Sequence, residues 1–243
     1  MATHEAGGSG CSGVCAVVEW AKLAVMTSST ARTGLRFLRE RSLIAAQLSP
    51  VAGIDEAGRG PWAGPVVAAA VILDPEHIPE GLDDSKTLTP AARELLFDTI
   101  TLHADVGVGI ADVARIDRDN ILQATLWAMA EAVAHLHHRP AIALVDGNRA
   151  PALGLATETI VDGDAMVASI AAASIIAKVT RDRLMIALSR HYPDYGFERH
   201  KGYGTPEHRN AIRHHGITPE HRRSFAPIRA AAAESLAWAR RQS

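Results

Sequence analysis

The sequence predicts an α/β fold in which a mixed central β-sheet is flanked by helices. Short apolar stretches bounded by turn residues or acids are typical of strands, and apolar residues every three or four positions are typical of helices. Along the chain the order is three strands, a helix, two strands and a second, long helix, which is the alternation of the α/β class. A length of 243 residues with 47% hydrophobic residues is enough for a substantial core.

The chain shows no internal repeat and no linker after residue 34, so residues 34–243 are expected to form one domain. Residues 1–33 are rich in Gly, Ser and Thr and are expected to be a poorly ordered extension. Both cysteines, Cys11 and Cys15, lie there, which excludes a disulfide framework and indicates a reducing compartment such as the cytoplasm. The apolar run of this extension is too short to span a membrane, so a soluble protein without membrane contact is expected.

The first elements are a docking helix and two paired strands. Residues 33–47 place Leu35, Leu38, Leu43 and Ile44 roughly on one helical face, with arginines between them. Two apolar stretches, "VAGID" and "GPVVAAAVIL", follow and are joined by a turn that contains Gly and Pro. This pattern predicts two strands that pair with each other.

A third strand is predicted at "DVGVGIADV". Its Gly107 and Gly109 make only a Gly-x-Gly pattern, with no third glycine before a helix. We therefore interpret them as glycines within a strand and exclude a dinucleotide-binding loop.

The second half of the predicted domain alternates helices and strands. Residues 120–137 have helical apolar spacing, with Asp119 near the start. Residues 141–147 and 156–165 are predicted as strands that carry acids at their carboxyl ends, and residues 165–192 as a long helix rich in Ala and Ser. Such small side chains would let the helix pack closely against the sheet.

Acids follow several of these strands. They are Asp55 with Glu56, then Asp146, then Asp162 or Asp164. A single acid after a strand is more often a turn former or a cap, but strand ends in an open α/β sheet can converge at one edge. Carboxylates packed together repel one another unless cations lie between them, and oxygen ligands without a Cys or His cluster indicate Mg²⁺ or Mn²⁺.

The adjacent acids Asp55 and Glu56 pose a geometrical problem, because neighbouring side chains on a regular strand point to opposite faces. Both can serve one site only if the strand ends or bulges there, or if Glu56 contributes its backbone carbonyl. Gly58 and Gly60 would make such a distortion easy. The Asp162 and Asp164 pair has the spacing of a phosphatase motif, but no nucleophile loop is suggested there.

Charge is unevenly distributed along the chain, although the formal net charge is only −2. Residues 181–243 hold 12 Lys and Arg against 6 Asp and Glu, whereas residues 1–180 hold 13 against 21. Half of the 12 histidines also lie in the basic part. A polyanionic partner is therefore plausible there, beside the commoner reading of a solvated surface with mixed charge.

Five motifs in sequence order resemble those of the type 2 ribonucleases H, in particular bacterial ribonuclease HII. The similarity runs from about residue 34 to residue 229 and implies a ribonuclease H-like sheet flanked by helices. The chain has no large N-terminal substrate-binding domain and keeps a Gly-Arg-Gly loop, which favours HII over HIII. The motifs are "GIDEAGRGPWAGPVV", "DDSKTLTPAARE", "ALVDG", "VDGDAMVASIAAASIIAKVTRD" and "YGFERHKGYGT".

The resemblance also implies roles for individual residues. The resemblance places Asp162 and Asp182 outside the site. For Asp182, which lies on a predicted helix, pairing with a neighbouring Arg or Lys is the simpler role. Close approach of a glycine loop to a 2′-hydroxyl is what separates RNA from DNA at a given site. The implied metal ligands are Asp55, Glu56, Asp146 and Asp164; the implied ribose-reading residues are Gly58, Arg59, Gly60 and Tyr203; the implied phosphate contacts are Lys86, Lys178 and Lys201.

The function that this resemblance implies is an endonuclease using two Mn²⁺ or Mg²⁺ ions. It would cut RNA in RNA–DNA hybrids and at ribonucleotides embedded in duplex DNA, leaving 5′-phosphate and 3′-hydroxyl ends, and would act as a monomer. Two alternatives stay open. A nucleic-acid-binding module without catalysis would gain nothing from four acids, and a phosphatase for small molecules would not need the basic C-terminal quarter.

Overall fold

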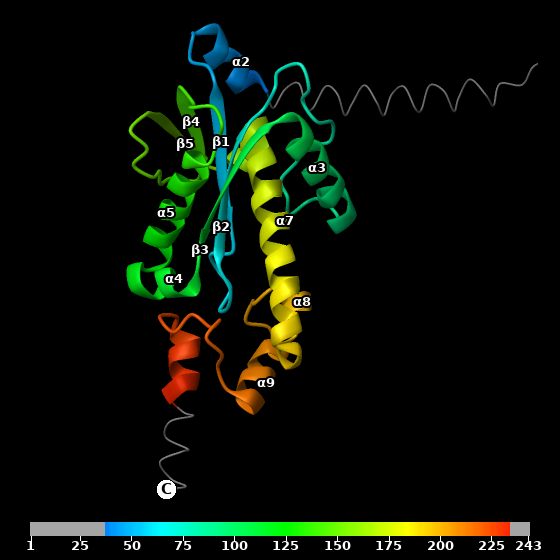
Figure 1. The fold of residues 1–243 in the computed structure, drawn as a ribbon, viewed down its shortest axis with the longest axis vertical. Helices are drawn as coiled ribbons and strands as arrows, with labels where there is room; N and C mark the ends of the chain where they lie inside the picture. Colours follow the sequence, from blue (N-terminus) through cyan, green and yellow to red (C-terminus); the bar gives the residue numbers. More distant parts are fainter. Residues whose placement is uncertain (1–36, 234–243) are drawn as a thin grey trace, which may run out of the picture.

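The computed structural model describes residues 37–233 (Figure 1). The expected extension at residues 1–33 and the first part of the expected docking helix lie outside the described residues. Within them, no helix has the length and apolar character needed to cross a membrane.

A mixed five-stranded sheet forms the centre, in the order β3-β2-β1-β4-β5. The central strand β1 (Val51–Ala57) runs antiparallel to β2 (Val66–Ile72) and parallel to β4 (Ile142–Asp146). The edge strands are β3 (Asp105–Ala111) and β5 (Ala156–Ile160). All five predicted strands and the pairing of the first two are confirmed; the structure shows that this pairing is antiparallel.

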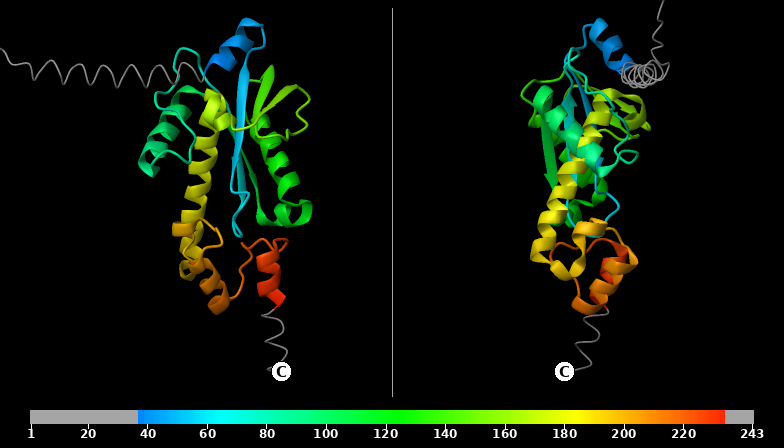
Figure 2. Two further views of the ribbon diagram at one scale, coloured as in Figure 1. Left: turned by 180° about the vertical axis from the view of Figure 1, so that it is seen from behind. Right: turned by 90° about the vertical axis from the view of Figure 1, so that its right-hand side faces the viewer.

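Helices cover both faces of the sheet, as Figure 1 and the view from behind in Figure 2 show. One face carries α7 (Ala168–His191) and α3 (Pro90–His103), and the other carries α5 (Ile121–Ala134) with α4 (Val113–Asp119). Alternate residues of β2 enter the two separate cores, with Val67 on the α7 side and Val66 on the α5 side. A strand buried on both faces reads as a continuous apolar run, as this one does.

Gly107 and Gly109 lie within β3, which confirms that they are glycines of a strand. A Cβ atom at Gly107 or Gly109 would fall well inside 3.0 Å of the carbonyl oxygens of Ala132 and Ala128 on α5. Only residues without a side chain allow the helix backbone to approach the strand so closely.

The helix expected at residues 120–137 is confirmed as α5, but Asp119 does not belong to its start. Two helices meet there, because Asn120 adopts a φ of 67° and its side chain accepts hydrogen bonds from the first amides of α5. Asp119 belongs to the preceding helix α4, where Arg115 and Arg118 pair with it. Helix α3 was not predicted; Thr89 caps it by accepting a hydrogen bond from the amide of Ala92.

The expected strand at residues 156–165 and long helix at residues 165–192 also need correction. Strand β5 ends at Ile160, and a short helix, α6 (Gly163–Met166), lies between it and α7. The docking helix is α2 (Leu38–Ala45), in which Leu43 is buried but Leu38 is 54% exposed, so Leu38 does not belong to the docking face. Glu40 fastens this helix by accepting hydrogen bonds from the amide and hydroxyl of Ser169.

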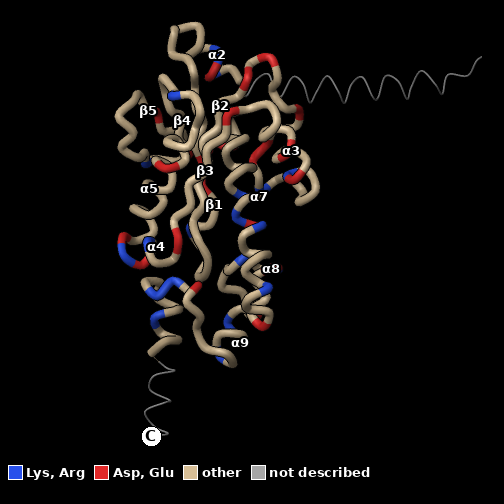
Figure 3. Tube along the Cα trace, in the orientation of Figure 1, with Lys and Arg blue, Asp and Glu red and all other residues tan. Residues whose placement is uncertain are grey.

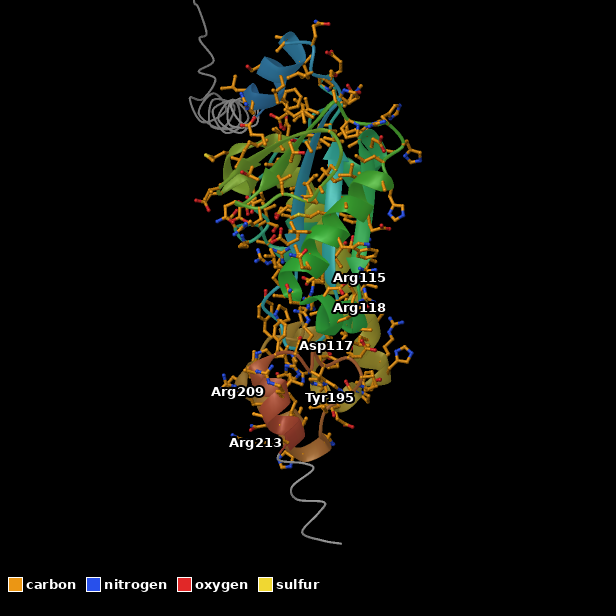
Figure 4. The ribbon with its side chains drawn as sticks, turned by 90° about the vertical axis from the view of Figure 1, so that its left-hand side faces the viewer. Arg115, Asp117, Arg118, Tyr195, Arg209 and Arg213 are labelled. Carbon is orange, nitrogen blue, oxygen red and sulfur yellow. The ribbon has the colours of Figure 1, made fainter. Side chains whose placement is uncertain are left out.

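The C-terminal region is helical, as expected, and has a core of its own. It contains η1 (Pro193–Tyr195), α8 (Phe197–His200), α9 (Pro206–His215) and helical residues 226–233. Figure 4 shows Asp117 on α4 above this region, where its carboxylate accepts bonds from the amides of Arg223 and Ser224. Lys and Arg are spread along these elements, as the sequence predicts (Figure 3).

Candidate active site

Three of the four predicted acids lie at the carboxyl ends of neighbouring parallel strands. The register pairs Ile54 with Val145, so Asp55 and Asp146 follow side by side at the ends of β1 and β4. Asp164 is not at a strand end as predicted; it lies in the first turn of α6. The carboxylate of Asp146 accepts hydrogen bonds from the amides of Gly163, at 2.8 Å, and Asp164, at 3.4 Å, which brings the turn to the strand.

Burial and mutual repulsion raise the pKa values of Asp55, Glu56 and Asp146. Asp55 is 5% exposed, and burial together with the charges of Glu56 and Asp146 raises its pKa well above the usual value. Burial and then the charge of Asp164 raise the pKa of Asp146. Burial also raises the pKa of Glu56, although Arg59 opposes the shift with a bond of 3.1 Å. Carboxylates in such a cluster ionise readily only if a cation is close to them.

The strand does not bulge at the two adjacent acids. Asp55, Glu56 and Ala57 pair in an uninterrupted register with β2, which excludes the bulge, and β1 ends one residue after Glu56, in line with the alternative that the strand ends there. The Asp55 carboxylate accepts a hydrogen bond from the backbone amide of Glu56 at 2.7 Å. The Glu56 carboxylate accepts a hydrogen bond from the side chain of Arg59. Use of the Glu56 backbone carbonyl as a ligand stays a prediction.

A lysine already occupies part of this acidic site. Lys86 donates to Asp164 at 3.1 Å and lies 3.7 Å from Asp84. Among residues 37–233, no three Asp, Glu, His or Cys side chains are arranged as a preformed metal site.

A cavity of about 460 Å³ joins the acids to the predicted substrate residues. It brings seven of the predicted residues together, and Asp164 reaches its edge through Lys86 and Asp146. Arg59, Gly60, Asp164 and Lys201 are not part of the lining. The lining residues are Asp55, Glu56, Ala57, Gly58, Ser85, Lys86, Arg93, Asp146, Ser174, Lys178, Arg181 and Tyr203.

All three predicted phosphate-binding lysines are engaged within the protein, Lys86 through its bond to Asp164. Lys178 lines the cavity but pairs at 2.8 Å with Asp182, one helical turn later, which confirms the expected role of Asp182. Lys201 donates to the backbone carbonyl of Glu198, and burial lowers its pKa. Asp162 is exposed just before α6, away from the cavity, as expected.

Tyr203 presents an aromatic ring at the cavity and is 48% exposed. Hydrogen bonds fix its backbone on both sides. Its amide donates to the carbonyl of His200, and its carbonyl accepts from the amide of Thr205 and the Nδ1 atom of His208. The ring lies beside Gly60, where a Cβ atom would be 3.5 Å from the ring edge. The Gly-Arg-Gly loop and the tyrosine thus adjoin, although about 140 residues separate them in the sequence.

Sequence reasoning missed Ser85, Arg93, Ser174 and Arg181. Arg93 donates to the carbonyls of Ser85 and Leu88, which holds the segment that carries Lys86. The hydroxyl of Ser174 on α7 bonds that of Ser85 at 2.7 Å. Ser85 and Arg93 lie within the second motif, and Ser174 and Arg181 lie within the fourth, so the motifs themselves were a signal for all four residues.

Comparison with known proteins identifies the family of the chain. The family model described as Ribonuclease HII matches residues 52–228. The chain belongs to the ribonuclease HII family. Among curated relatives, ribonuclease HII of Azorhizobium caulinodans is 60% identical over 197 residues, covering 81% of this chain and 76% of the relative. Ribonuclease HII of Xanthobacter autotrophicus is 61% identical over 196 residues, covering 81% and 79%.

Solved structures support the same assignment. The ribonuclease H2 of Pyrococcus horikoshii matches with a TM-score of 0.64 and 31% identity, covering 76% of this chain and 97% of that one. The ribonuclease HII of Archaeoglobus fulgidus, solved in complex with PCNA, matches with a TM-score of 0.61 and 29% identity, covering 71% and 93%. The ribonuclease H-like fold is therefore confirmed, and the chain is a ribonuclease H endonuclease that acts on RNA–DNA hybrids.

Proposed function

We propose that this ribonuclease HII cuts the RNA strand of hybrids and also cuts duplex DNA on the 5′ side of an embedded ribonucleotide. The products would carry 5′-phosphate and 3′-hydroxyl ends. The observation that carries the proposal is the single cavity that holds Asp55, Glu56 and Asp146 together with Gly58 and Tyr203. Acids suited to phosphodiester hydrolysis and groups suited to reading a sugar thus face one space.

The donor set at this cavity fits a divalent cation of the Mg²⁺ or Mn²⁺ class. It consists of carboxylate oxygens, which these hard ions prefer, and the Lys86 ammonium on Asp164 shows that a positive charge is accommodated there. Asp55, Glu56, Asp146 and Asp164 would hold the ions. When bound, two such ions supply an activated water and polarisation of the scissile phosphate.

The other residues of the site would position the substrate. The Tyr203 ring can stack on a sugar, as exposed aromatic rings do in nucleic-acid sites. The Gly58 to Gly60 loop can approach a 2′-hydroxyl closely because its glycines have no side chains. Lys86, Lys178 and Lys201 would contact phosphates, and in doing so Lys86 would exchange its carboxylate partner for a substrate oxygen.

The test uses three labelled duplexes: an RNA–DNA hybrid, DNA with one ribonucleotide, and DNA alone. The parent protein is incubated with Mn²⁺, with Mg²⁺ or with chelator, and the product ends are mapped. We expect cutting of the first two duplexes only, with a metal only, and at the 5′ side of the single ribonucleotide. An intact single-ribonucleotide duplex beside a cut hybrid would contradict the proposal, and Asp146→Asn, which removes a proposed ligand, serves as the inactive control.

We further propose that the enzyme works as a monomer in the cytoplasm. Both cysteines lie in the extension at residues 1–33, a placement that suits a reducing compartment. Light scattering during gel filtration should give a mass near 25.9 kDa. A stable dimer mass would contradict the first part of this proposal.

A further inference from the structure

Arg222 lies fully buried beneath the Gly-Arg-Gly loop and bonds only to backbone carbonyls there. Its exposed fraction is 0%. All three nitrogen atoms of its guanidinium donate to backbone carbonyl oxygens, over distances of 2.6–3.1 Å. The Nε atom donates to the carbonyl of Gly64, the Nη1 atom to those of Arg59 and Pro61, and the Nη2 atom to those of Gly58 and Pro65. A guanidinium has five N–H donors. Five carbonyls of residues 58–65 therefore converge on one side chain.

The buried charge of Arg222 indicates that these bonds are strong ones. Within residues 37–233 no ion pair joins it to a carboxylate, and burial, with the charge of Arg181, lowers its pKa to about 9. A buried charge without a counter-ion is expensive unless its donors are all satisfied. Hydrogen bonds from a charged donor are shorter and stronger than neutral ones, so the carbonyls are held firmly.

The position of the carbonyls determines where the loop amides point. The peptide bonds of this loop are trans, and a planar trans peptide directs its C=O and its N–H to opposite sides. Because the carbonyls of Gly58 and Arg59 face Arg222, the amides of Arg59 and Gly60 face away from it. Neither amide donates a hydrogen bond within the described part of the chain.

A second arginine supports the same loop from α7. Arg181 donates to the carbonyls of Pro65 and Ala63, at 3.0 and 3.2 Å. Gly58 has a φ of 98°, and a Cβ atom there would fall within 3.0 Å of the Arg181 side chain. The loop is thus supported by guanidinium groups from two elements.

We propose that Arg222 is a positioning residue: it preforms the loop so that the free amides of Arg59 and Gly60 are already directed at the ribonucleotide before the substrate binds. This inference rests on the proposed function, because it names the group that organises the reading of the sugar. Arg222 itself touches neither the substrate nor the cavity.

The first test is a pair of matched substitutions. Arg222→Lys keeps the charge, but an ammonium group cannot reach five carbonyls at once. Arg223→Lys makes the same change at the next, exposed residue. On DNA with one ribonucleotide, assayed well below each melting temperature, we expect Arg222→Lys to lose kcat/KM by about tenfold or more and Arg223→Lys to stay within about twofold.

The second test measures the backbone mobility of the loop in the parent protein, so it does not depend on whether a variant folds. ¹⁵N relaxation should give order parameters near 0.85 for the Arg59 and Gly60 amides, which is typical of rigid backbone. Arg222→Lys should lower these values, and so, more weakly, should Phe225→Leu, which removes the ring 5.2 Å from the guanidinium.

Two outcomes would overturn the inference. One is a parent loop that is already mobile, with order parameters below about 0.6; the other is a folded Arg222→Lys variant with unchanged kcat/KM. Failure of the proposed function looks different: the parent would leave the single-ribonucleotide duplex uncut, whatever the loop relaxation shows.

Discussion

At the residue scale, the carboxylates of the site work against the fold. Asp55 is almost fully buried beside Glu56 and Asp146, and this burial, together with repulsion from the two neighbouring acids, raises its pKa well above the usual value. Within residues 37–233 its carboxylate accepts a hydrogen bond only from the amide of Glu56, which opposes this rise in pKa. A residue kept in so unfavourable a place is more useful to chemistry than to stability.

Asp55→Asn should therefore stabilise the protein in the absence of metal while abolishing cleavage. The amide still accepts the hydrogen bond from Glu56 but carries no charge, so the gain in unfolding free energy should be on the order of 1 kcal/mol. Thermal melting in chelator and cleavage of a hybrid measure the two effects. Asp162→Asn, an exposed change nearby, should alter neither, and a lower melting temperature for Asp55→Asn would contradict this account.

Tyr203→Ala should weaken cutting at a single ribonucleotide more than cutting within a long hybrid. A hybrid offers many alternative positions, whereas the junction depends on one sugar contact. Loss of a stacking contact is worth about 1–3 kcal/mol, so the junction-specific loss in kcat/KM should be roughly ten- to a hundredfold. Tyr203→Phe keeps the ring and should retain most of the activity; equal losses on both substrates would mean that Tyr203 serves the fold or general binding instead.

At the scale of elements, the site depends on how closely the helices approach the sheet. The strand glycines of β3 let α5 pack against it backbone to backbone, and small residues make most of the α7 face that packs on β1 and β2. This close packing sets the distance between the strand ends that carry the acids and the α7 residues that line the cavity, among them Ser174 and Lys178.

Gly109→Ala should destabilise the protein because its Cβ atom has no room. That atom would fall within 3.0 Å of the Ala128 carbonyl, so helix and strand must separate. Overpacking of this kind lowers the unfolding free energy by about 1–3 kcal/mol. Ile110→Ala, at a 44% exposed position of the same strand, should change it by less than about 0.5 kcal/mol in urea unfolding; a Gly109→Ala variant as stable as the parent would show that the interface yields easily.

At the scale of the whole molecule, a chain of buried histidines ties the tyrosine to the C-terminal region. His208 bonds the Tyr203 carbonyl through Nδ1 and lies 3.0 Å from His221, nitrogen to nitrogen. His221 accepts the amide of Thr218 through its other nitrogen, so it must donate to His208. Both rings are therefore neutral, and burial lowers their pKa values to about 4 for His208 and about 3 for His221.

This arrangement predicts a loss of stability on acidification. Below pH 6.5 the unfolded chain protonates these histidines while the folded protein does not, so the unfolding free energy falls as pH falls towards 4. Each histidine contributes about 1.4 kcal/mol per pH unit in that window. Acids with raised pKa values act in the opposite direction, so the variant comparison below isolates the histidines.

Urea unfolding at pH 7.5, 6.0, 5.0 and 4.5 measures the slope. His221→Gln should reduce the slope of unfolding free energy against pH by the amount that corresponds to about one proton. The glutamine amide can accept from Thr218 and donate to His208, but it does not titrate. His214→Gln, an exposed change, should leave the slope as it is in the parent. A parent slope matched by His221→Gln would contradict the assignment.

The sequence alone determined the five strands, the mixed sheet and the three acids that follow β1 and β4. Apolar periodicity and strand-end acids are local patterns, so they survive in a single sequence. Asp164 was chosen correctly as a neighbour of the acids but was placed on the wrong element, because a two-residue turn after β5 starts a helix that no periodicity marks. Helix α3 was missed for a similar reason, since its first residues lie inside the "DDSKTLTPAARE" motif and were interpreted only as part of that motif.

Only the tertiary structure decided which basic groups are free and which are engaged. Lys178 and Lys201 look like phosphate ligands in the sequence, but one pairs with Asp182 and the other with a backbone carbonyl. Arg222 meets Gly58 across a separation of 164 residues, and nothing near either residue announces the contact. The physical reason is that a long flexible side chain takes the partner that packing brings within reach, and packing is set by the whole chain rather than by its neighbours in sequence.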